Sequence, residues 1–244
     1  MPPLVLTFAA SDPTGGAGLQ ADLLTIAAHG CHPLSVLTAV TVQDTRGVER
    51  VEALSADLVA QQAMALLGES TVAAFKVGVL GSLDNARAVA AVAKKYASVP
   101  LVLDPVLASG RGDPLASEET VGTMVAHATV ITPNTLEAKR LGGHHALLAQ
   151  GCPYVLVTGT HDETPEVVNR LYDARGLVRE DRWPRLSGSY HGSGCTLASA
   201  LASLLARGRA VPQAVQEAQE FTWRSLQAAF PSGKGQSTPN RFFR

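Results

Sequence analysis

The sequence predicts an α/β fold, a three-layer αβα sandwich with a mainly parallel central sheet. Two observations lead to this prediction. Apolar runs of strand length alternate with helical patterns almost throughout, and most of these runs are continuous rather than interrupted by polar residues. Continuous apolar strands are typical of parallel sheets buried between two helical layers. Because 46% of the 244 residues are apolar, the chain can bury a sizeable core, and we expect a single domain over residues 1–244.

The first expected unit is a strand, a loop, a helix and a second strand. Residues 4–9 are an uninterrupted apolar run and predict a buried strand. A glycine-rich loop at residues 11–18 follows, and then a helix over residues 19–29, which Gly30 ends. Residues 34–42 are rich in valine, leucine and threonine, so they predict the second strand.

Serine residues mark helix starts in the middle of the chain. Ser55 and Ser82 are good N-cap residues, because a hydroxyl oxygen can accept hydrogen bonds from the free amides of a first helical turn. The expected elements are helices over 55–68, 83–96 and 117–127, and strands over 75–80, 101–105 and 130–133.

The last part of the chain is predicted to be mostly helical. Asn134 caps a short helix that carries Glu137, and one further strand covers residues 154–158. Residues 173–189 are polar and predict a strand-poor stretch that crosses to the last motif. Two helices over 194–207 and 213–230 complete the chain.

Composition and charge exclude several classes of protein. The formal net charge of −1 gives no reason to expect nucleic acid or an anionic membrane as a partner. No apolar run approaches the length of a membrane-spanning helix, and the N-terminus lacks a secretory leader, so we expect a cytoplasmic protein. The three cysteines are Cys31, Cys152 and Cys195, a sparse set that predicts neither a disulfide framework nor a zinc site.

The most informative stretch is residues 191–201, where a glycine-rich turn leads into an apolar helix. Gly192, Ser193 and Gly194 leave backbone amides free at the helix start, where the helix dipole adds partial positive charge. This arrangement predicts an anion site for phosphate, and the same field favours a thiolate at Cys195. A glycine-rich turn with a small buried cysteine is an equally good interpretation of this stretch alone.

Two other positions suggest a site for a small substrate. The loop around Gly16 matches neither a phosphate-binding P-loop nor a dinucleotide fingerprint. We interpret it as a backbone-lined wall with Asp12 or Asp22 facing the substrate, although an ordinary tight turn is the alternative. Gln43 ends a predicted strand, and its amide can donate and accept together, as an aminopyrimidine edge requires. A solvated strand end is the simpler interpretation of Gln43.

Oxygen-bearing side chains follow two further strands. Asp104 ends one strand, while Asn134 and Glu137 lie three residues apart at a helix start and therefore share a face. Mg²⁺ prefers carboxylates, retained waters and substrate phosphates, so these residues are candidates for a nucleotide–metal side. Simple helix capping explains Asn134 and Glu137 equally well.

The stretch Asp12–Asp22 resembles the N-terminal signature of bacterial hydroxymethylpyrimidine/phosphomethylpyrimidine kinases, which belong to the ribokinase-like superfamily. The resemblance continues in chain order through shorter motifs at residues 38–43, 76–80, 103–106, 112–115, 132–138, 191–196 and 233–235. It implies a ribokinase-like kinase domain and ATP-dependent phosphorylation of 4-amino-5-hydroxymethyl-2-methylpyrimidine, then of its monophosphate, in thiamine biosynthesis. ATP would be the co-substrate, Mg²⁺ the metal and a homodimer the assembly.

The resemblance also implies roles for individual residues. Gln43 would read the pyrimidine edge, with Gly78 and Val106 lining the pocket, and Cys195 would stand where most ribokinase-like enzymes place an aspartate base. The residues implied on the ATP and Mg²⁺ side, of which Glu137 and Asp104 would hold the metal through water, are Asn134, Glu137, Asp104, Thr158, Gly159 and Lys234.

Three departures from the family pattern stand out. The segment 141–152 is short, so we expect a trimmed helix on the outer face. Thr158 stands where the family has lysine, which predicts altered phosphate handling, and Asn169 stands where an aspartate is expected. Glycines within residues 109–112 would permit a mobile flap. A pyridoxine or pyridoxal kinase and a non-catalytic pyrimidine-binding relative are the alternative functions.

Overall fold

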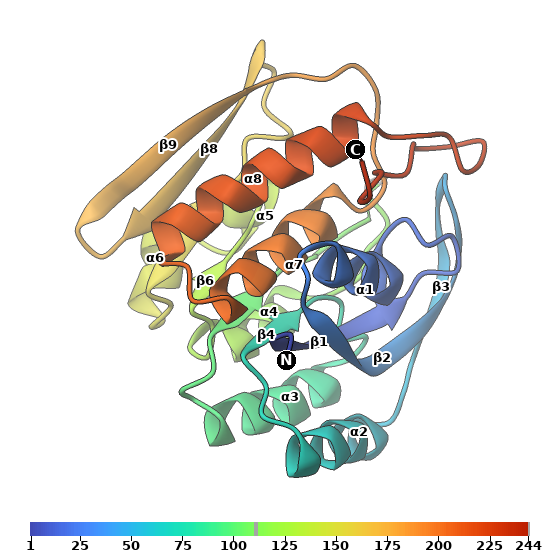
Figure 1. The fold of residues 1–244 in the computed structure, drawn as a ribbon, viewed down its shortest axis with the longest axis vertical. Coiled ribbons are helices and arrows are strands. Elements are labelled where there is room, and N and C mark those ends of the chain that lie inside the picture. Colours follow the sequence, from blue (N-terminus) through green and yellow to red (C-terminus); the bar gives the residue numbers. More distant parts are fainter. Residues whose placement is uncertain (110–111, 244) are drawn as a thin grey trace.

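The computed structural model describes residues 1–109 and 112–243, and it confirms the α/β class with a mainly parallel sheet (Figure 1). The strands form one sheet in the order β3-β2-β1-β4-β5-β6-β7-β8-β9. The pairs from β2 through β7 are parallel, whereas β3, β8 and β9 join antiparallel at the two edges. The strand bounds are β1 Leu4–Ser11, β2 His32–Asp44, β3 Gly47–Ala53, β4 Ala74–Val77, β5 Leu101–Leu103, β6 Val130–Ile131, β7 Tyr154–Val157, β8 Glu166–Asp173 and β9 Gly176–Pro184.

Helices cover both faces of the sheet, which gives the three predicted layers (Figure 1). One layer holds α1 (Gly18–Ala28), α7 (Ser193–Ala206) and α8 (Val211–Gln227). The other holds α2 (Ala56–Glu69), α3 (Leu83–Lys95), α4 (Glu118–Val125) and α6 (Gly143–Ala149), with α5 (Thr135–Arg140) beside α6.

Alternate residues of the central strands point into the two layers. Val5 of β1 packs in the cluster that contains Ile26 of α1 and Leu201 of α7. Its neighbour Leu6 packs in the opposite cluster, which contains Val89 of α3. A strand buried on both faces in this way has to be apolar throughout, which explains why the continuous apolar runs predicted the central strands correctly.

The predicted helix starts are confirmed. The Ser55 hydroxyl accepts a hydrogen bond from the Leu58 amide, and the Ser82 hydroxyl accepts one from Asn85. Asn134 and Glu137 form a complete capping box at the start of α5, in which each side chain accepts from the backbone amide of the other.

The prediction that residues 173–189 are poor in strands is wrong, since β9 covers nine of them. This stretch completes β8 and forms β9, an antiparallel hairpin at the sheet edge. Asn169, Leu171 and Asp173 alternate along the more buried side of β8. The other side carries cross-strand ion pairs such as Arg170–Glu180 at 2.8 Å. The polar composition therefore reflects a solvated sheet face.

The short segment between residues 141 and 152 still contains the two-turn helix α6, whose Leu147 is fully buried. Both Gly142 and Gly143 have φ above +80°, a conformation that favours glycine, so the chain turns sharply between α5 and α6. Among the described residues, no helix is long and apolar enough to span a bilayer.

Candidate active site

The loops after the parallel strands converge with the N-terminus of α7, as the topology predicts. They bring together Asp12 after β1, Gly78 after β4, Asp104 after β5, Asn134 after β6 and Thr158 after β7. The turn before α7 lies at one end of this arrangement, and α5 and the loop after β7 lie at the other.

The turn before α7 has the geometry predicted for an anion site. Gly192 is the N-cap residue, with φ of +83°, and the first helical hydrogen bond runs from the Thr196 amide to the Gly192 carbonyl at 3.0 Å. The amides of residues 193–195 therefore have no acceptor within the helix. A Cβ on Gly192 would overlap the Gly16 carbonyl oxygen, so glycine is required both for the turn and for the close approach of the two loops.

The first and last motifs of the chain are joined by a histidine–aspartate contact. His191 Nε2 lies 2.8 Å from Asp12 Oδ2, and the Asp12 carboxylate also accepts from the Ala17 and Thr14 amides. Burial alone would raise the pKa of Asp12, but the hydrogen bonds from His191, Ala17 and Thr14 hold that pKa below its usual value. Asp12 and Gly16 are both buried at this junction. The Asp12 side chain therefore fixes the loop and is not exposed to solvent.

A fully buried ion pair lies next to this turn. Lys76 Nζ is 2.9 Å from Asp22 Oδ1 and 3.9 Å from Asp104 Oδ2. Asp22 also accepts hydrogen bonds from the hydroxyls of Thr7 at 2.6 Å and Ser199 at 2.7 Å. The prediction that Asp22 faces the substrate is wrong, because its side chain is fully buried and both oxygens are bonded within the protein.

Lys76 was missed as a site residue from the sequence. The one available signal is a lysine inside an apolar strand, which is rare unless the charge is paired. Although burial disfavours the ammonium, the Asp22 carboxylate raises the pKa of Lys76 above its usual value. A Cβ on Gly78 would come within 2.7 Å of Lys76 Nζ, so the glycine makes room for the charge.

The predicted thiolate at Cys195 is contradicted. Burial raises the pKa of the Cys195 thiol to about 12, and the Lys76 charge opposes this shift only in part because Asp104 and Asp22 add to it. The field of the helix N-terminus is therefore outweighed by desolvation and neighbouring carboxylates. Cys195 is a thiol at neutral pH in this structure.

Asp104 and Glu137, the two residues predicted to hold Mg²⁺ through water, both have raised pKa values. Burial raises the pKa of Asp104, and burial with the nearby Asp104 charge raises the pKa of Glu137 to about 7. Glu137 accepts from the amides of Asn134 at 3.0 Å and Leu107 at 3.3 Å, whereas Asp104 Oδ2 is buried without a hydrogen-bond partner among the described residues.

These carboxylates fit Mg²⁺ held through water. Asp104 Oδ2 accepts no hydrogen bond from the described residues and has Lys76 Nζ only at 3.9 Å, and the pKa of Glu137 is raised, so a further cation would stabilise both carboxylates. In the described part of the chain, no group of three His, Cys, Asp or Glu residues could enclose a metal ion.

The residues expected on the pyrimidine side come from different strands, since Gln43 lies on β2 while Gly78 and Val106 follow β4 and β5. Gly78, Asp104 and Val106 line one small cavity at the carboxyl ends of β4 and β5. Gln43 lies at a bulge near the end of β2, and its Nε2 donates to Thr41 Oγ1 at 2.7 Å.

Hydrogen bonds to the buried side-chain amides of Asn169 and Gln219 hold the loop after β7 in place. Thr158 pairs with Asn134 in an isolated parallel bridge, which brings these two predicted residues together. The Gly159 amide donates to Asn169 Oδ1 at 3.0 Å, and Asn169 Nδ2 donates to Gln219 Oε1 at 2.8 Å. Asn169, a departure from the family pattern, therefore ties this loop to β8 and α8.

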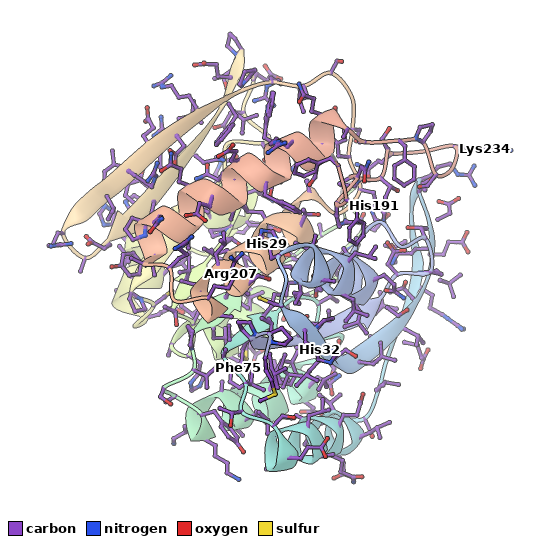
Figure 2. All side chains as sticks on the ribbon, viewed as in Figure 1. His29, His32, Phe75, His191, Arg207 and Lys234 are labelled. Carbon is purple, nitrogen blue, oxygen red and sulfur yellow. The ribbon has the colours of Figure 1, made fainter. Side chains whose placement is uncertain are left out.

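Lys234 lies apart from the other residues predicted on the ATP and Mg²⁺ side. Its loop packs on the β2–β3 turn, where the Gly235 amide donates to Thr45 Oγ1 at 2.9 Å. It borders a surface pocket of about 430 Å³ with residues that include Thr14 and Arg46. Figure 2 shows Lys234 at the periphery near β3, across the molecule from α5 and α6, and its assignment to the ATP side stays a prediction. Residues 110 and 111 of the expected flap lie outside the described residues.

Similarity to known proteins agrees with this arrangement. A relative from Streptomyces coelicolor, named hydroxymethylpyrimidine/phosphomethylpyrimidine kinase, is 41% identical over 254 residues, covering 96% of this chain and 92% of its own. The Bacillus subtilis pyridoxal kinase structure with ADP has a TM-score of 0.89 at 27% identity, covering 99% of this chain and 98% of its own. The Clostridium difficile phosphomethylpyrimidine kinase structure has a TM-score of 0.77 at 32% identity, covering 90% and 97%. Since residues 12–240 match the sequence model of the phosphomethylpyrimidine kinase family, the chain belongs to that family.

Proposed function

We propose that this chain transfers the γ-phosphoryl group of ATP to 4-amino-5-hydroxymethyl-2-methylpyrimidine, to its monophosphate, or to both, in thiamine biosynthesis. The observation that carries the proposal is the free-amide turn at residues 192–195 beside Asp104, whose Oδ2 accepts no hydrogen bond among the described residues and lies 3.9 Å from Lys76 Nζ. An oxyanion site next to a metal-side carboxylate is what phosphoryl transfer needs for charge neutralisation. Membership of the family supports the same reaction.

In the proposed reaction the hydroxymethyl oxygen attacks the γ-phosphorus. An O–P bond forms, the bond between the β,γ-bridging oxygen and the γ-phosphorus breaks, and ADP leaves with the electron pair. The amides of Ser193, Gly194 and Cys195 would donate to the equatorial oxygens of the transferred group. Asp104 and Glu137 would hold Mg²⁺ through water, which would neutralise charge on the nucleotide phosphates.

The proton of the hydroxymethyl group has to leave during attack, since an alcohol is a weak nucleophile. We assign this proton to Cys195, whose neighbour Lys76 would stabilise the thiolate form. With a resting pKa of about 12 the thiol holds its own proton at neutral pH. That proton would pass to the Asp104 carboxylate, with which the thiol shares a hydrogen bond, as the hydroxymethyl proton moves to the sulfur. Gln43, Gly78 and Val106 would hold the pyrimidine.

Pyridoxal kinase is the second candidate function. The observation in its favour is the TM-score of 0.89 to a pyridoxal kinase, compared with 0.77 to a phosphomethylpyrimidine kinase. Sequence identity points the other way, at 27% compared with 32%. A non-catalytic relative that binds pyrimidine is the third candidate, suggested by Thr158 in place of the family's lysine.

The test is ADP release from Mg²⁺-ATP with the hydroxymethylpyrimidine, its monophosphate and pyridoxal in parallel. The proposal expects the highest kcat/KM with one or both pyrimidines. Faster turnover of pyridoxal would support the second candidate instead. Tight pyrimidine binding without ADP release would support the third.

The homodimer and the cytoplasmic location stay predictions. Light scattering of the purified protein would measure its mass against the 25.4 kDa of one chain. A mass of one chain at assay concentration would contradict the dimer.

A further inference from the structure

The chain ends in a segment that returns to the anion turn. After α8, an isolated bridge pairs Phe230 with Thr238, and another pairs Ser237 with Tyr190. The second bridge places this segment next to the turn that begins at His191. This contact places Arg241, which is only 3% exposed, between the first and last motifs of the chain.

The guanidinium of Arg241 binds both loops of the junction. Its Nη2 donates to the Gly16 carbonyl at 2.5 Å and its Nη1 to the Gly15 carbonyl at 3.4 Å. Its Nε donates to Thr196 Oγ1 at 3.1 Å, and that hydroxyl donates to the Gly192 carbonyl at 2.8 Å. One side chain therefore connects the loop after β1 to the N-cap of α7.

The three acceptors of Arg241 are all neutral, so its charge has no bonded counterion among the described residues. The nearby acids are Asp12 and Asp22, and both carboxylates are already bonded, Asp12 to His191 and Asp22 to Lys76. Burial lowers the pKa of Arg241, although Cys195, Asp22 and Asp12 oppose that shift. A buried cation is costly unless an anion compensates it, and the adjacent free-amide turn is the place for an anion.

We propose that Arg241 is a positioning residue for phosphoryl transfer, which locks the loop at Gly15 and Gly16 against the N-cap of α7 and lends its positive charge to the anion held there. The inference rests on the proposed function. A neutral side chain could donate the same hydrogen bonds, so charge is the property that a test has to isolate.

The variants Arg241→Gln and Arg241→Lys separate charge from hydrogen bonding, because glutamine keeps a donor and lysine keeps the charge. Arg224→Gln is the matched control, since Arg224 lies in the same region, is exposed, and stacks 4.6 Å from the Phe243 ring without reaching the loops. Two quantities are measured for each protein: kcat and KM with ATP and hydroxymethylpyrimidine, and the rise in melting temperature that inorganic phosphate causes in the absence of nucleotide.

We expect Arg241→Gln to lower kcat by about tenfold or more while the pyrimidine KM changes by less than about threefold, because the lost charge acts on the transferred group. Phosphate should stabilise Arg241→Gln less than it stabilises the wild type. Arg241→Lys should recover part of both effects, and Arg224→Gln should match the wild type in both.

A lower melting temperature of Arg241→Gln with unchanged kcat and an unchanged phosphate effect would overturn the inference, since Arg241 would then only anchor the C-terminal segment. A wild type that phosphate does not stabilise would also overturn it. If the wild type turns over no pyrimidine, the proposed function fails, and the phosphate measurement still decides the role of Arg241.

Discussion

His191 Nε2 and Asp12 Oδ2 lie 2.8 Å apart although 179 positions separate the two residues in the chain. This contact holds the loop after β1 against the turn that begins α7, and both sides of the proposed anion site depend on it. Figure 2 shows His191 beside α1, on the segment that leads into α7.

We predict that His191→Ala loosens the anion turn. The kcat for pyrimidine phosphorylation should fall about tenfold, because a small displacement of preorganised donors weakens charge stabilisation. His32→Ala is the control, since His32 is exposed at the start of β2. Steady-state kinetics of both variants check the prediction, and equal kcat values would contradict it.

The buried pair of Lys76 and Asp22 should dominate local stability. Replacing Lys76 by methionine leaves the Asp22 carboxylate buried without its cation, which we expect to cost about 3–5 kcal/mol of unfolding free energy. Arg87→Gln, which removes an exposed ion pair with Asp84, should cost less than about 1 kcal/mol. Urea denaturation measures the unfolding free energy of both variants. A loss for Lys76→Met as small as that for Arg87→Gln would show that the buried pair is not required for stability.

Glu137 should make stability depend on pH. Its folded pKa of about 7 lies above the unfolded value near 4.5, so the folded state holds the proton more tightly. The resulting stabilisation is complete below about pH 4.5 and is lost as pH rises through about 7, by about 3 kcal/mol. Glu137→Gln should remove this pH dependence, whereas Glu119→Gln on exposed α4 should retain it. The measurement is the unfolding free energy between pH 4.5 and 8, and identical profiles for the wild type and Glu137→Gln would refute the assignment.

Cys195 carries the proposed base. We expect Cys195→Ala to lower kcat by about 10²- to 10⁴-fold, because proton removal accompanies attack. Cys31→Ser serves as the control, since Cys31 is buried elsewhere and donates to the Ser203 carbonyl. Near-normal kcat in Cys195→Ala would leave the anion site in place but would reject the base.

The sequence predicted the centre of the fold better than its edges. The continuous apolar runs around Leu6 and Leu103 identified central strands, because burial on both faces leaves no room for polar residues. The edge strands β3 and β9 were missed because each is solvated on at least one side, and their pairing depends on neighbouring strands rather than on their own composition.

Motifs identified the site in part. The turn at Gly192 and the pairing of Asn134 with Thr158 follow from residues at strand and helix ends. The burial of Asp22 beside Lys76 could not be predicted, because the loop pattern does not reveal which carboxylate turns inward. Arg241 carries no local signal at all, since its importance arises only where the C-terminal segment meets the first loop.

The most direct test of the central claim is product analysis after separate incubations of hydroxymethylpyrimidine and of its monophosphate with Mg²⁺-ATP labelled with ¹⁸O in the γ-phosphoryl group. Mass spectrometry of at least one of the two pyrimidines should show one added phosphoryl group that carries the label, with ADP as the other product. Labelled inorganic phosphate with both pyrimidines unmodified would contradict the account, since the anion site would then transfer the phosphoryl group to water rather than to the substrate.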